Sequence, residues 1–119
     1  MKHIYVVVER DPLVAIDLQE IIADYDDGAS VRLVETLDDA VAILTTTLST
    51  ATVVVSSSAD LVISSGLGDA VSSTQSRMII IDQEVSAEPG SVLHCRYLKA
   101  PFTTESLTQA LSTFSDVAQ

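Results

Sequence analysis

Residues 4–14, IYVVVERDPLV, predict the start of an α/β fold because an apolar strand passes directly into a capped helix. Ile4–Val8 is mostly β-branched and uncharged, which is typical of a strand buried on both faces of a sheet. Asp11 and Pro12 then mark a helix start, since aspartate caps free amides and proline is tolerated in the first turn. The helix continues with apolar residues at helical spacing: Val14, Leu18, Ile21, Ile22 and Tyr25.

The same strand–helix alternation repeats along the chain. Further strands are expected at residues 30–34, 52–55, 78–81 and 92–98, with helix starts at Thr36 and at Thr103 or Thr104. Residues 45–76 hold 15 of the 26 Ser and Thr, so we expect only short or irregular helices there. Pro89-Gly90 similarly predicts a stunted helix within residues 83–90. Alternating buried strands and helices predict a three-layer α/β/α fold around a parallel sheet, in one domain over residues 1–119.

Composition limits the classes of function. The chain has 119 residues and a formal net charge of −11, which disfavours binding to nucleic acid and to anionic membranes. The single cysteine, Cys95, excludes an intrachain disulfide and agrees with a reducing compartment. No targeting or membrane-spanning segment is evident, so we expect a cytoplasmic protein. His3 and His94 lack a matched carboxylate spacing, and we expect structural roles for them and no metal site.

Three segments carry a resemblance to a known family: residues 6–15 (VVVERDPLVA), 37–41 (LDDAV) and 97–102 (YLKAPF). They resemble the response-regulator receiver domains of the CheY-like superfamily, which take part in two-component phosphorelay signalling. The resemblance implies a flavodoxin-like, five-stranded parallel sheet in the order 2-1-3-4-5. It also implies a pocket at the carboxyl ends of the strands, which is where open α/β sheets bind ligands.

In that family an acidic pair after the first strand binds Mg²⁺, and an aspartate after the third strand accepts the phosphoryl group. A hydroxyl after the fourth strand and a lysine after the fifth hold the phosphoryl oxygens. A guanidinium cannot ligate Mg²⁺ and a serine lacks the acceptor carboxylate, so we expect no Mg²⁺ cofactor, no aspartyl phosphorylation and no enzyme activity. The corresponding residues here are Glu9 and Arg10 for the acidic pair, Ser56 for the acceptor, Asp82 for the hydroxyl, and Ala100, preceded by Lys99, for the lysine.

The chain is therefore interpreted as an atypical receiver, or pseudo-receiver, that acts through protein–protein interaction. The expected partner is a histidine kinase or another regulator, and homodimerisation is a further hypothesis. The expected interaction face, taken from the surface through which receiver domains pair, comprises Tyr97, Phe102, Leu107 and Phe114. At the strand ends, either Arg10 pairs with a carboxylate such as Asp82 in a switch pocket, or it lies in a solvated turn.

Three alternatives stay open at the level of sequence. An alternative register makes residues 59–65 the third strand and puts Ser65 at the acceptor position. Residues 63–68, ISSGLG, also resemble the phosphorylated turn of anti-sigma-factor antagonist (STAS) domains, which serine phosphorylation switches. For that family a mixed sheet is expected, in contrast to the parallel sheet of a receiver. Finally, the chain could be a receiver that retains residual phosphotransfer.

Overall fold

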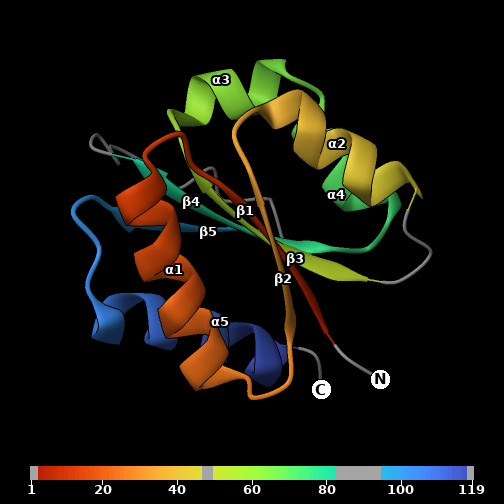
Figure 1. Cartoon of the computed structure of the whole chain (residues 1–119). Coiled ribbons are helices and arrows are strands. Elements are labelled where there is room, and N and C mark those ends of the chain that lie inside the picture. The colour runs from red at the N-terminus through yellow and green to blue at the C-terminus, as the bar shows by residue number, and fades with distance from the viewer. Residues whose placement is uncertain (1–2, 47–49, 83–94, 118–119) are drawn as a thin grey trace.

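The structure is a computed structural model that describes residues 3–46, 50–82 and 95–117 (Figure 1). The side chains of residues 59, 60, 63 and 113–117 lie outside this description. Five parallel strands form one sheet in the order β2-β1-β3-β4-β5, which confirms the predicted topology. The strands are β1 (Ile4–Val8), β2 (Ser30–Val34), β3 (Ala51–Ser56), β4 (Arg77–Asp82) and β5 (Cys95–Lys99).

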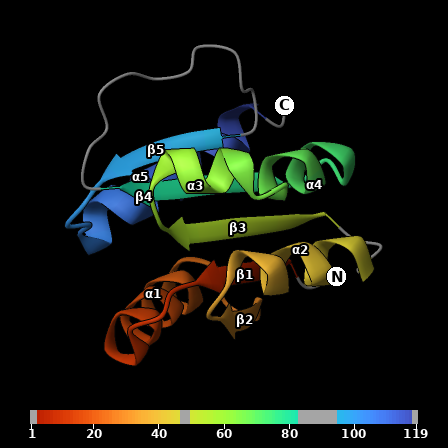
Figure 2. The same ribbon diagram turned by 90° about the horizontal axis from the view of Figure 1, so that it is seen from above.

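Helices cover both faces of the sheet, giving the expected three layers (Figures 1 and 2). Because side chains alternate along a strand, Val53 and Val55 of β3 face one helical layer while Val54 faces the other. The first layer contains α2 (Leu37–Thr46), α3 (Ala59–Ser64) and α4 (Leu67–Ser73), and the second contains α1 (Pro12–Tyr25) and α5 (Thr104–Val117).

The predicted helix starts are confirmed by their capping hydrogen bonds. The Asp11 side chain accepts a hydrogen bond of 3.0 Å from the Leu13 amide, and Pro12 is the first residue of α1. The Thr36 hydroxyl accepts one of 3.1 Å from the Asp39 amide at the start of α2. Of the two candidates for the last helix, Thr103 is the cap, because its hydroxyl accepts the Ser106 amide at 3.0 Å.

After β3, the Ser-rich stretch of residues 57–76 folds into two short helices, as expected. α3 and α4 are separated by Gly66, whose φ of 85° lies in the left-handed region that glycine adopts without strain. Hydroxyl groups here bond to carbonyls of the preceding turn: Ser65 Oγ donates to Val62 O at 2.8 Å, and Thr74 Oγ1 to Ala70 O at 2.7 Å. Such bonds compete with regular helix pairing, which explains the short lengths.

Two alternative interpretations are therefore wrong. Residues 59–64 form helix α3, so the register that makes 59–65 the third strand fails and Ser56 is the residue that ends β3. All described strands are parallel, which contradicts the mixed sheet expected for an anti-sigma-factor antagonist domain. The expected helix within residues 83–90 and the first part of the expected strand at 92–98 lie outside the described residues. Within the described part, no helix has the length and apolar character needed to cross a membrane.

Candidate functional site

The carboxyl ends of three neighbouring strands surround a pocket of about 430 Å³. β1 ends at Val8 and β3 at Ser56, and the turn after β2 leads into α2 on the same side. In this topology, that is the edge at which ligands of open α/β sheets bind. The pocket is lined by Val8, Glu9, Arg10, Glu35, Thr36, Leu37, Asp38, Ser56, Ser57, Leu61 and Ser65.

Glu9 and Arg10 occupy the turn that follows β1. The Glu9 amide donates to Val34 O at 3.0 Å, which extends the pairing of β1 with β2 by one residue. The Glu9 carboxylate accepts a hydrogen bond of 3.0 Å from the Asp11 amide, so it stabilises the turn. The Arg10 side chain is exposed and makes no ion pair with any residue that the structure describes. Of the two interpretations of Arg10, the geometry therefore matches the solvated turn.

Three serines, Ser56 to Ser58, lie at the end of β3. Ser56 is the last residue of β3 and pairs in register with Ile81 of β4. Ser57 lines the pocket beside it, and Ser58 caps α3 by accepting the Leu61 amide at 3.3 Å. The structure thus brings Ser56 together with Glu9 and Arg10, as the sequence predicts for the strand ends.

The remaining predicted site residues lie at the ends of β4 and β5 and do not line this pocket. Asp82 pairs in register with Lys99, and the Asp82 carbonyl accepts the Ala100 amide at 2.8 Å. Lys99 is exposed, whereas Ala100 packs against the core that α1 and α5 cover. The two side chains therefore alternate, as expected for consecutive residues of a strand. Asp82 is not among the residues that line the pocket of Glu9 and Arg10.

The pocket at the carboxyl ends of the strands is lined by side chains of both charges. Mg²⁺ is held by one or two carboxylates in near-octahedral oxygen geometry. Glu9, Glu35 and Asp38 line the pocket together with Arg10, and the Glu9 carboxylate accepts a hydrogen bond from the Asp11 amide. Across residues 3–46, 50–82 and 95–117, no three His, Cys, Asp or Glu side chains gather as a metal site. These residues thus offer a mixed-charge surface beside the hydroxyl of Ser56.

The predicted interaction face needs correction. Leu107 is fully buried between α5 and the sheet, so it belongs to the core and is not available to a partner. Tyr97 packs against the α2–α4 side of the sheet and Phe102 against the α1–α5 side, so these two rings do not share a face. Both are partly buried, and burial raises the pKa of Tyr97 to about 12. The side chain of Phe114 lies outside the described part.

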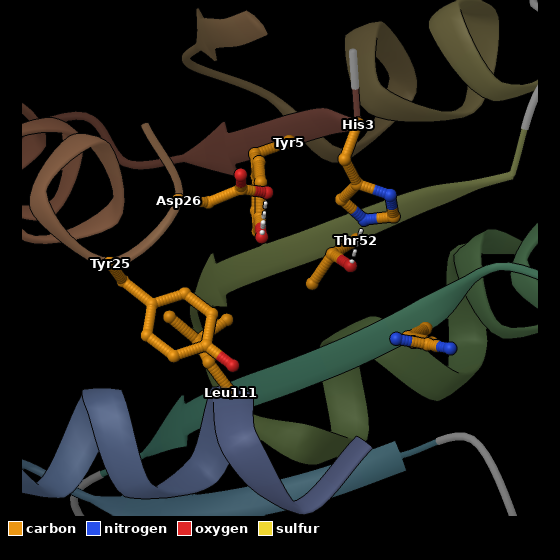
Figure 3. A pocket seen from close by; sticks show the side chains of 7 residues that line it. His3, Tyr5, Tyr25, Asp26, Thr52 and Leu111 are labelled. Atoms are coloured by element: carbon orange, nitrogen blue, oxygen red, sulfur yellow. Dashed lines mark hydrogen bonds between the residues drawn. The ribbon is translucent and has the colours of Figure 1, made fainter. Parts of the chain in front are cut away.

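A second pocket, of about 480 Å³, lies at the opposite end of the sheet, near the amino ends of the strands (Figure 3). His3 Nε2 and Thr52 Oγ1 are 2.7 Å apart, and the Tyr5 hydroxyl donates to Asp26 Oδ2 at 2.9 Å. The rings of His3 and Tyr5 meet edge to face with centroids 4.7 Å apart. Burial raises the pKa of Tyr5, and the hydrogen bond to Asp26 raises it further.

From the sequence we expect only a structural role for His3, and this pocket is not predicted. The available signal was strand alternation, because residues two apart on a strand point to the same face. His3 and Tyr5 have that spacing, and Thr52 and Arg77 occupy the corresponding early positions of β3 and β4. What alternation could not supply was the register, which sets these residues side by side.

The environment of His3 predicts a pH dependence of stability. Burial lowers the pKa of His3, the charge of Arg77 lowers it further, and the charge of Asp26 raises it in part. The unfolded chain therefore takes up a proton before the folded one, so the free energy of unfolding should decrease as the pH falls below about 6.5. We expect His3→Gln, which can still bond to Thr52 but does not titrate, to lose less stability over that range. Urea unfolding at several pH values measures this, and an unchanged pH dependence in His3→Gln would contradict it.

Comparison with known proteins gives a fold but no close relative. No protein-family model and no curated protein matches the chain by sequence. Among solved structures, the chemotaxis protein CheY4 of Vibrio cholerae matches with a TM-score of 0.73 and 14% identity, covering 95% of this chain and 98% of that one. A response regulator receiver domain protein of Bacillus halodurans matches with a TM-score of 0.69 and 23% identity, covering 95% and 97%. A CheY-like protein, TadZ, of Pseudomonas aeruginosa matches with a TM-score of 0.65 and 16% identity, covering 94% and 98%.

Sheet order, layers and structural neighbours together show that this chain has the fold of the CheY-like response-regulator receiver domains.

Proposed function

We propose that this chain is an atypical receiver domain of two-component, phosphorelay-type signalling that acts by protein–protein interaction without Mg²⁺-dependent aspartyl phosphorylation. The fold supports the receiver part of this proposal, since the matching structures include a chemotaxis protein and a receiver domain protein. Fold alone does not define function, so the absence of aspartyl phosphorylation has to be argued from the side chains at the strand ends.

The observation that carries the proposal is the pocket shared by Glu9, Arg10 and Ser56. Phosphoryl transfer to a carboxylate needs an acceptor carboxylate and a cation that neutralises the phosphoryl charge. Ser56 has no carboxylate, and the positive charge of Arg10 opposes the entry of a divalent cation. Without a phosphoryl group, the usual shift between two conformations on phosphorylation has no chemical trigger.

Exposed apolar residues near the same edge support interaction with a protein. The large apolar side chains exposed in the described part lie on α1, β2 and α3: Leu13, Ile16, Leu33 and Leu61. Ile16 and Leu33 line a shallow apolar pocket of about 280 Å³ that also includes Glu9 and Arg10, and Leu61 lines the pocket at the strand ends. Clustered apolar exposure with a polar rim marks interaction surfaces. The net charge of −11 would speed association with a basic partner surface, such as one on a histidine kinase or another regulator.

Labelling with a small phosphodonor tests the proposal. We expect no mass increase corresponding to a phosphoryl group when the protein is incubated with acetyl phosphate and Mg²⁺, because neither acceptor nor ion site is provided. Intact-mass spectrometry is the measurement, and a typical receiver domain treated in parallel is the positive control. A phosphoryl adduct that needs Mg²⁺ would contradict the proposal and favour a receiver with residual phosphotransfer.

A further inference from the structure

The pocket at the amino ends of the strands contains a row of three residues on adjacent strands. Tyr5 of β1 pairs in register with Thr52 of β3, and Thr52 pairs in register with Arg77 of β4. Adjacent strands lie about 4.8 Å apart, so this row extends across roughly 10 Å of sheet. All three side chains line the same pocket, on the face that α1 and α5 cover.

The two ends of this row carry opposite charges: Asp26 lies beside Tyr5, and Arg77 is the last residue of the row. Asp26 caps the end of α1, and its carboxylate is held by the Tyr5 hydroxyl at 2.9 Å (Figure 3). Arg77 stands at the other end of the row, at the start of β4. Both charges act on His3 and Tyr5: the charge of Arg77 lowers the pKa of each side chain, and the charge of Asp26 raises it. Both charged residues are half-buried, so water screens their fields less than on an open surface.

The remaining walls of the pocket are apolar or aromatic. Tyr25, the last residue of α1, and Leu111 of α5 lie together on the side away from His3 and Thr52 (Figure 3). The exposed surface of the pocket is mostly polar, and Tyr25 and Leu111 supply its apolar part. Its volume of about 480 Å³ falls within the usual range for small-molecule sites.

The charge pattern selects the class of ligand. A simple anion would be attracted by Arg77 but repelled by Asp26, and a simple cation would meet the reverse situation. A molecule that carries both charges satisfies both ends at once. We propose that this pocket binds a free α-amino acid with an apolar side chain. Its carboxylate faces Arg77, its ammonium group faces Asp26, and its side chain packs against Tyr25 and Leu111.

This site is separate from the one at the strand ends. The pocket of Glu9, Arg10 and Ser56 lies beyond the carboxyl ends of β1 and β3, whereas this row lies near their amino ends. The two lining sets share no residue. Ligand binding here would give the domain an input that requires no phosphoryl chemistry, and it stands or falls independently of the proposed function.

A titration of the ¹⁵N-labelled wild-type protein by NMR tests the inference. We expect L-leucine to shift the backbone amides of Tyr5, Thr52 and Arg77 in a saturable way at concentrations up to about 10 mM, which detects millimolar dissociation constants. N-acetyl-L-leucine lacks the ammonium group and L-leucinamide lacks the carboxylate. Each should bind at least about tenfold more weakly than L-leucine.

Matched variants test whether Arg77 and Asp26 bind the two charged groups of the ligand. Arg77→Gln and Asp26→Asn should each weaken L-leucine binding at least about tenfold, while the exposed Arg32→Gln and Asp27→Asn should leave it unchanged. Each variant is checked for folding by its amide spectrum before titration. The absence of saturable shifts in the wild-type protein at about 10 mM L-leucine, or equal binding of the acetylated or amidated compound, overturns the inference even if a variant fails to fold.

Discussion

Replacing Leu18 with alanine is expected to lower the free energy of unfolding by about 2–5 kcal/mol, the usual cost of truncating a large aliphatic side chain in a packed core. Leu18 is fully buried, and it lies with Ile22 and Leu107 in the layer between the sheet and the helices α1 and α5. The truncation removes apolar burial and leaves a cavity that the tightly packed surroundings fill only in part. Urea unfolding followed by circular dichroism measures the loss.

Leu13 provides the matched control, because it lies on the same helix but is 76% exposed. Leu13→Ala should change the free energy of unfolding by no more than about 0.5 kcal/mol, as is usual for surface substitutions. If both substitutions cost the same, α1 does not pack against the sheet through Leu18, and the layered core described above is wrong. A selective loss in Leu18→Ala supports that core.

The second large effect is a gain of metal binding. The double variant Arg10→Asp with Ser56→Asp replaces a cation by a carboxylate and adds a second carboxylate at the end of β3, in the pocket that Glu9 also lines. Carboxylate oxygens are the protein ligands that Mg²⁺ prefers, so we expect affinity for Mg²⁺ to rise at least about tenfold over the wild-type protein. Isothermal titration with MgCl₂ gives the two affinities.

The control for the change in net charge is a second double variant that includes Arg32→Asp, an exposed residue on the edge strand β2. Arg32→Asp combined with Ser30→Asp, also on β2, changes the charge of the protein by the same amount as the double variant but lies outside the pocket. It should bind Mg²⁺ like the wild-type protein. If this control on β2 raises the affinity as much as the double variant in the pocket does, the gain is a general effect of charge and Arg10 does not block the site.

The fold could be predicted from the sequence because its signals are local. The uncharged run of β1, the Asp11-Pro12 cap and the Thr36 cap each act over a few residues, and the structure places them as predicted. In the Ser-rich segment the signals conflict, since hydroxyls that bond to the preceding turn weaken the helices. The sequence could therefore predict short helices there but not where α3 ends and α4 begins.

The candidate sites were less predictable because they depend on contacts between distant segments. Strand ends predicted that Glu9, Arg10 and Ser56 would meet, but not that Asp82 would lie outside their pocket. The sequence could not decide whether Arg10 pairs with a carboxylate or stays solvated, because an exposed ion pair adds only about 0–1 kcal/mol to the free energy of unfolding. The row formed by Tyr5 and its neighbours on β3 and β4 depends on the register of three strands, which no single segment encodes.

The most direct test of the account is an NMR titration of the wild-type protein with beryllofluoride and Mg²⁺, since beryllofluoride mimics a phosphoryl group on an aspartate. We expect the amides around Glu9 and Ser56 to keep their chemical shifts, because Ser56 at the end of β3 has no carboxylate and Arg10 lines the same pocket. Saturable, Mg²⁺-dependent shifts at these amides would contradict the account and identify the chain as a receiver that still takes up a phosphoryl group.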